Sequence, residues 1–142
     1  MERVRKAKEV RVVTGNKVGM LAEITKQIFR AGVNIEDICA YARGEEASFY
    51  LITSDNEKVK STLSRKGYQI EERDVVILSL ENRPGALSEV AEELKKAGIN
   101  LKYIYATTSE KAEKTTIVLS SNNDDKAVEV LGYVLTLSSW GR

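Results

Sequence analysis

NRPGAL at residues 82–87 repeats NKVGML at residues 16–21, at a shift of 66 residues along the chain. The same shift places AGVNI at 31–35 over AGINL at 97–101, so no residue is inserted or lost between the two matching blocks. Chance rarely produces two matches at one shift, and a fixed period is the mark of an internal repeat. The sequence therefore predicts two copies of a small domain, which we place at residues 9–72 and 73–142.

Each copy begins with a strand and an amphipathic helix. The β-branched runs at 10–14 and 75–80 are typical of buried strands, and apolar residues then recur at helical spacing. Gly32 and Gly98 follow these segments, at the position where a left-handed residue commonly ends a helix. We therefore expect the helix of each copy to end at its glycine.

The remainder of each copy predicts a hairpin, a second helix and a last strand. The hairpin strands are expected at 33–43 and 48–53 in the first copy, and at 99–108 and 115–120 in the second. Asn and Asp residues then favour a helix start, and a last strand is expected from Tyr68 or Tyr133. The element order is βαββαβ in both copies.

This order predicts an α+β fold of two tandem ferredoxin-like units. Each unit is expected to be a four-stranded antiparallel sheet with two helices on one face. Units of about 70 residues bury a small core and leave sheet edges unpaired. We therefore expect the units to associate and the chains to form homodimers.

Composition argues against several classes of partner. Lys and Arg number 22 and Asp and Glu 21, so the net charge of +1 offers no basic excess for nucleic acid. No apolar run is long enough to cross a membrane, and the start of the sequence lacks the apolar stretch of a signal peptide. We expect a cytoplasmic protein that binds neither nucleic acid nor membrane.

The sequence is also poor in groups that carry out catalysis. It contains no histidine, and its one cysteine, Cys39, cannot form a disulfide within the chain or build a Cys-x-x-Cys metal motif. No pair of acidic residues is placed in a recognisable cleft. We therefore expect no catalytic residue, no metal, no cofactor and no enzymatic activity.

The turn between the first strand and the first helix is the candidate ligand site. The opening N–H groups of a helix lack intrahelical partners and favour an anion such as a carboxylate. Asn82 supplies a donor and an acceptor, and Gly85 has no Cβ to keep a ligand from the backbone. Pro84 has a φ suited to the first helical turn.

ENRPGAL at 81–87, followed by a helix and AGINL at 97–101, resembles the ACT domain, a regulatory module of many amino-acid-metabolising enzymes; residues 16–35 resemble a second. The resemblance implies that an amino acid binds where two units meet, with the strand-to-helix turn of one facing the second strand of its partner. The implied ligand contacts are Asn16, Lys17, Val18, Gly19, Met20, Leu21, Asn34 and Ile35 in the first copy, and Asn82, Arg83, Pro84, Gly85, Ala86, Leu87, Asn100 and Leu101 in the second.

Two departures from the family pattern bear on specificity. Serine-sensing members carry a histidine shortly before the turn asparagine, where this sequence has Thr14 or Leu80. The first copy also has Val18 where proline is usual. The sequence therefore does not support serine as the ligand.

The favoured function is a sensor of an amino acid or related metabolite that acts in trans on a metabolic enzyme or other partner. The main alternative is a ligand-free interaction or dimerisation module that keeps the fold, in which the asparagines serve only as turn or helix-cap residues. RNA-binding domains share the βαββαβ order, but the strand segment at 48–51 lacks their pattern of glycine and aromatic residues, and the segment at 115–118 has no aromatic residue to read bases.

Overall fold

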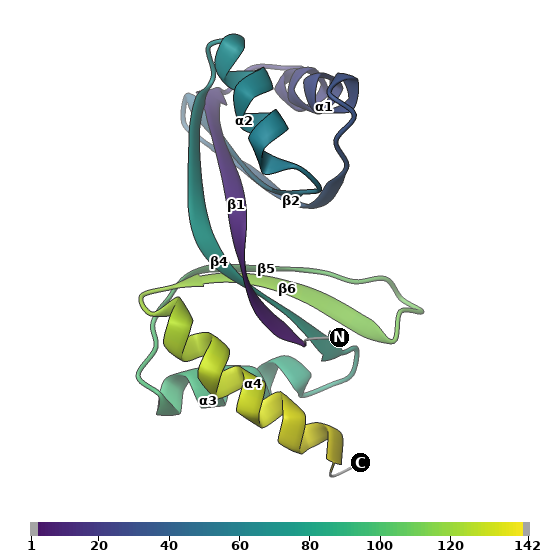
Figure 1. Ribbon diagram of the computed structural model, residues 1–142, viewed down its shortest axis with the longest axis vertical. Coiled ribbons are helices and arrows are strands. Elements are labelled where there is room, and N and C mark those ends of the chain that lie inside the picture. Colours follow the sequence, from purple (N-terminus) through teal and green to yellow (C-terminus); the bar gives the residue numbers. More distant parts are fainter. Residues whose placement is uncertain (1–2, 141–142) are drawn as a thin grey trace. The chain divides into compact units, whose positions relative to one another are not determined.

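The computed structural model describes residues 3–140, except for the side chains of residues 134 and 136–140. Its strands join in one antiparallel sheet with the order β2-β3-β1-β4-β6-β5; α1, α2 and α3 connect strands, and α4 follows the last strand (Figure 1). The elements are β1 (Val4–Gly15), α1 (Met20–Arg30), β2 (Ile35–Arg43), β3 (Glu46–Thr53), α2 (Asn56–Arg65), β4 (Gln69–Glu81), α3 (Ala86–Lys96), β5 (Leu101–Thr107), β6 (Lys114–Ser121) and α4 (Asp124–Trp140).

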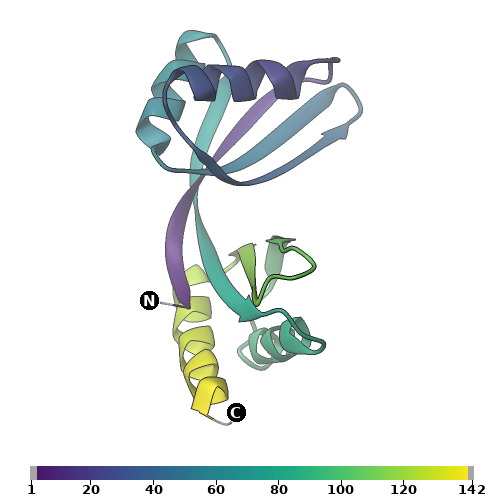
Figure 2. The same ribbon diagram turned by 90° about the vertical axis from the view of Figure 1, so that its right-hand side faces the viewer.

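The chain divides into two compact units. The first unit is Lys8–Arg73, and the second unit joins the residues up to Ala7 to those from Asp74 onward. In each unit two helices cover one face of four strands, α1 and α2 in the first and α3 and α4 in the second (Figures 1 and 2). The predicted ferredoxin-like architecture is therefore confirmed.

The core of the first unit lies between its sheet and its two helices. Val10 and Val12 of β1 flank the half-buried Arg11 and lie opposite Leu51 and Phe49 of β3. Ile24 and Ile28, one helical turn apart, bring α1 onto this face, and α2 does the same with Val59 and Leu63. The period of two in the strands and of four in the helices thus places all the apolar faces together.

The core of the second unit repeats this pattern. Val76 and Leu78 of β4 lie opposite Leu119 and Ile117 of β6. The helices contribute buried residues at the same spacing, namely Val90 and Leu94 from α3, and Ala127 and Leu131 from α4.

The fourth strand of the second unit differs from the prediction. Tyr133 lies within the 17-residue helix α4, so the strand expected from this residue is wrong. The N-terminal part of β1 occupies the place instead: the Ser79 N–H donates to the Arg3 carbonyl at 2.8 Å, and Val4 is buried in the second core. Residues that the repeat assigned to neither copy therefore complete the second unit.

A difference between two aligned glycines accompanies this outcome. Gly67 adopts a φ of 85°, which ends α2 just before Tyr68, whereas Gly132 is not among the glycines with positive φ and α4 continues through it. After Gly67 the chain enters β4, which runs without a break into the strand predicted at 75–80.

Candidate functional site

Two equivalent turns carry the predicted ligand contacts. The Asn16 turn (residues 16–19) joins β1 to α1, and the Asn82 turn (residues 82–85) joins β4 to α3. Each ends in a left-handed glycine at the helix N-cap, Gly19 with φ 89° and Gly85 with φ 87°. Side chains other than glycine cost about 1–2 kcal/mol in this region, so the backbone itself requires glycine here. Pro84 precedes the N-cap, and the expectation that it opens the first helical turn is wrong.

The asparagines fasten these turns to the hairpin of the same unit. The Asn82 side chain donates from Nδ2 to the carbonyls of Ala112, at 2.9 Å, and Ser109, at 3.3 Å. Asn16 donates from Nδ2 to the Gly44 carbonyl at 3.1 Å. Both amide hydrogens of Asn82 are thus used within the protein, which leaves its Oδ1 as the acceptor that a ligand could reach.

The helices that follow the two turns begin without a side-chain cap. No side chain accepts from the first N–H groups of α1 or α3, whereas Asp55 accepts from the Lys58 N–H at the start of α2. The first N–H groups of any helix lack intrahelical acceptors and carry the positive end of the dipole. Both turns therefore offer donors to a carboxylate.

The basic residues of the two turns differ in their partners. Arg83 donates from Nε to Glu81 at 2.9 Å and from Nη2 to Glu89 at 2.8 Å, and it also donates to the Pro84 carbonyl. Lys17, its counterpart in the first unit, is exposed and has no charged partner among the described residues. In the second unit, acidic side chains therefore neutralise the charge of the basic turn residue, whereas in the first unit no described residue neutralises the charge of Lys17.

Asn34 and Asn100 lie at the opposite end of their hairpins. The Asn34 N–H donates to Ser54 Oγ, beyond the end of β3, whereas Asn16 binds the turn before β3 begins. β3 has 8 residues, so roughly 26 Å of strand separates the two ends. Asn100 is held in the same way by Asn122, beyond β6. The structure therefore does not bring either asparagine pair together within one unit.

The remaining predicted contacts are largely apolar. Val18, Leu21 and Leu87 are exposed, while the side chain of Ala86 is buried in the second core. Met20, Ile35 and Leu101 are half-buried. A ligand could therefore touch the exposed three without any rearrangement, but could not reach the Ala86 side chain.

Two clefts flank the Asn16 turn. A groove of about 270 Å³ lies between the turn and β2, with Leu21, Ala40 and Phe49 among its lining residues. A cleft of about 830 Å³ lies on the side of the α2–β4 turn and is lined by Lys66 and Tyr68 as well as the Asn16 turn. We did not expect Lys66 and Tyr68 to be site residues, because only the fold shows that their turn lies at the same end of the sheet.

Tyr68 lines this cleft and has a strongly altered pKa. Its hydroxyl donates to the Glu23 carboxylate, and its ring packs against the first core. Burial, reinforced by the bond to Glu23, raises the pKa of Tyr68 to about 12. The phenol therefore keeps its proton to a higher pH than an unperturbed tyrosine does.

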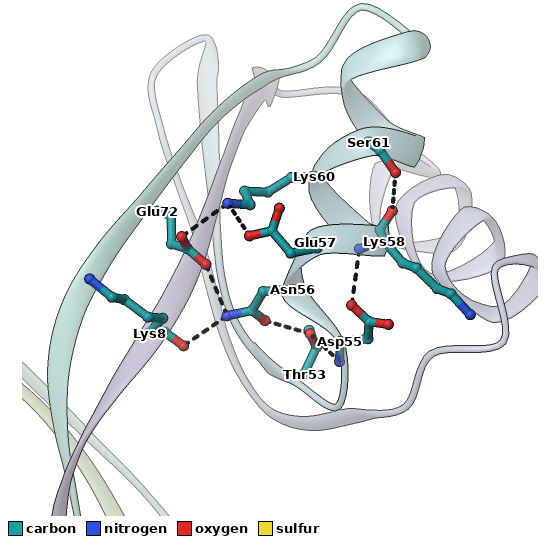
Figure 3. A network of polar contacts seen from close by, with 9 residues as sticks. All are labelled: Lys8, Thr53, Asp55, Asn56, Glu57, Lys58, Lys60, Ser61 and Glu72. Carbon is teal, nitrogen blue, oxygen red and sulfur yellow. Dashed lines mark hydrogen bonds and ion pairs between the residues drawn. The ribbon is translucent and has the colours of Figure 1, made fainter.

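A second polar cluster, at the start of α2, is satisfied internally (Figure 3). Asn56 donates to the Lys8 carbonyl at 3.1 Å, and Lys60 pairs with Glu57 at 2.7 Å and Glu72 at 3.0 Å. These contacts join α2 to β1 and β4, so we assign the cluster a structural role. Within residues 3–140 no group of three or more His, Cys, Asp or Glu side chains could hold a metal ion, and no helix is long and apolar enough to cross a membrane.

Residues 75–135 match the family model of the ACT domain. The chain contains an ACT domain. This ACT domain includes the Asn82 turn and Asn100. No curated protein matches the sequence.

Several solved structures share the fold over most of their length. A protein from Bacteroides thetaiotaomicron is 28% identical with a TM-score of 0.84, covering 92% of this chain and 89% of that one. The ligand-free regulatory subunit of aspartate kinase from Thermus thermophilus is 13% identical with a TM-score of 0.65, over 89% and 93% of the two chains. A structure of aspartokinase alpha and beta subunits is 19% identical with a TM-score of 0.62, over 94% and 97%. The fold around the ACT domain therefore also occurs in regulatory proteins.

Proposed function

We propose that this protein binds an amino acid or a related small metabolite and regulates a separate enzyme or other partner, without catalytic activity of its own. The observation that carries the proposal is the ACT domain at 75–135, whose Asn82 turn precedes a helix that no side chain caps. The aspartate kinase regulatory subunits that share the fold support a regulatory role.

The turn geometry suggests how an amino acid would bind. Its carboxylate would accept from the N–H groups that open α1 or α3, and its ammonium would donate to Oδ1 of Asn16 or Asn82. Asn34 and Asn100 lie too far away to reach the same ligand from the same unit. A site that uses both asparagines therefore needs a second unit, either from the same chain or from a second copy of the chain in a homodimer.

A thermal-shift screen of the full chain against each of the twenty amino acids tests this function. A ligand at about 100 times its dissociation constant adds about 2.7 kcal/mol of stability and raises the unfolding midpoint by several degrees. A selective shift that Asn100→Ala abolishes would support the proposal. The absence of any shift, together with the absence of heat in calorimetry, would reject amino-acid sensing.

The second candidate is a ligand-free interaction module. It is favoured by the Asn82 turn, where both amide hydrogens of Asn82 and the guanidinium of Arg83 are already engaged within the unit. This function predicts stable dimers whose dissociation constant no amino acid alters. Sedimentation with and without the twenty amino acids separates the two candidates.

A further inference from the structure

Three turns surround the 830 Å³ cleft of the first unit, and each contributes one cation. Lys17 comes from the Asn16 turn, Arg43 from the end of β2 and Lys66 from the turn between α2 and β4. These residues are far apart in the sequence and meet because the three turns lie at the same end of the sheet. The fold therefore brings three positive charges together that no single sequence motif contains.

None of these cations has a side-chain partner among the described residues. All three are exposed, and the Lys17 side chain lies back along the strand end, with its Cε 3.6 Å from the place of a Cβ on Gly15. Glu45 and Glu46 also line the cleft, and their carboxylates are likewise unpaired in the part of the chain that the structure describes. The cleft thus presents uncompensated groups of both charges.

The wall of the cleft is more rigid than its charged rim. Tyr68 packs against the first core and donates to Glu23, and both residues line the cleft. Neither group has to be ordered when a ligand enters, which lowers the entropic cost of binding. The flexible rim can then adjust to the ligand.

We propose that this cleft is an amino-acid site separate from the Asn82 turn and that one unit suffices to form it. The ligand carboxylate would bind among Lys17, Arg43 and Lys66, and the ammonium would bind Glu45 or Glu46. The nearly equal numbers of free cations and anions favour a zwitterion over a simple anion. This inference rests on the proposed function and places its ligand in the first unit, although the ACT match covers the second.

The second unit lacks the means to form the same cleft. The counterpart of Lys17 is Arg83, which Glu81 and Glu89 already bind. α4 continues through Tyr133, so the turn that supplies Lys66 and Tyr68 in the first unit has no equivalent. We therefore expect only the first unit to form this amino-acid site.

Calorimetric titration of the full chain with each of the twenty amino acids, repeated on variants, tests the inference. Arg43→Gln and Lys66→Gln should each weaken binding of the responding amino acid by about tenfold or more, because each removes a charge-assisted hydrogen bond. Lys26→Gln, an exposed lysine of α1 outside the cleft, is the matched control and should leave the affinity unchanged. Unchanged thermal unfolding midpoints without ligand would show that the variants remain folded.

The other outcomes are distinguishable. Binding that survives Arg43→Gln and Lys66→Gln would overturn the inference, and its loss in Asn82→Ala or Asn100→Ala would then place the ligand at the ACT turn and preserve the proposed function. The absence of binding by all twenty amino acids would overturn both.

Discussion

At the scale of single residues, Asn82 shows how a family motif can be structural as well as functional. Its side chain joins the strand-to-helix turn to the β5–β6 hairpin through two carbonyls, and Asn16 does the same with one. The asparagine is thus needed to position the turn, whether or not a ligand binds. Its effect on binding has to be separated from its effect on stability.

Replacement of Asn82 by alanine should lower the free energy of unfolding by about 1 kcal/mol, because two exposed hydrogen bonds are lost. Asn16→Ala removes one such bond and should cost less. Asn34→Ala is the matched control, since that side chain has no partner among the described residues, and it should change stability by less than about 0.5 kcal/mol. Urea unfolding of the three variants measures these differences, and equal losses would contradict the role of Asn82 and Asn16 in holding their turns against the hairpins.

The Tyr68 phenol predicts a loss of stability at high pH. Its pKa rises from 10.0 to about 12 on folding, so its contribution is complete below pH 10 and is lost as the pH rises to about 12. The unfolded chain releases the proton within this range while the folded chain retains it. Tyr68→Phe should flatten the fall in stability between pH 10 and 12, as measured by urea unfolding at each pH, and an identical profile in the variant would contradict the assignment.

At the scale of elements, most of the fold could be predicted from the sequence. Apolar spacing placed both helix–hairpin segments, and Gly32 and Gly98 do take the left-handed conformation that was expected after α1 and α3. The fate of the segment after Gly132 could not be predicted, because the run from Tyr133 is apolar enough for a strand or a helix. The N-terminal part of β1 takes the strand position that was expected for this segment. Such a pairing between distant parts of the chain is visible only in the tertiary structure.

The candidate site was less predictable than the fold. The Asn82 turn could be identified because its residues are contiguous and repeat at a fixed shift. Arg43, Lys66 and Tyr68 could not be identified, because none of them belongs to a recognisable motif. They line a common cleft only because the fold brings their turns together.

The N-terminal part of β1 should stabilise the second unit. Val4 is 9% exposed and belongs to the second core, so Val4→Ala should cost about 2 kcal/mol. Arg5→Ala, at an exposed position of the same strand, is the control and should be nearly neutral. Amide exchange should accelerate in β4 around Ser79 and in β6. Faster exchange confined to the first unit would show that the strand is assigned to the wrong unit.

At the scale of the whole molecule, exposed apolar residues favour association of two chains. Ile38 lies on β2 at one edge of the sheet, and Leu21 on α1 lines the neighbouring groove. Ile38→Glu should weaken the proposed homodimer about tenfold or more in analytical ultracentrifugation, because a charge at an edge opposes pairing. Tyr133→Glu changes an exposed residue away from the edge and should have no effect. A chain that is monomeric at all concentrations would contradict the dimer.

The assignment of residues 3–7 to the second unit has a consequence for biosynthesis. In topology the first unit is an insertion within the second, so the N-terminal part of β1 is synthesised well before its partners in the second unit and must wait for residues up to α4. At ordinary rates of translation this delay is roughly 7 to 30 seconds. Arg3, Arg5, Lys6 and Lys8 give the waiting strand a dense positive charge, which discourages premature pairing with other chains. These four charges should therefore keep the unpaired strand from aggregating until its partners in the second unit have been synthesised.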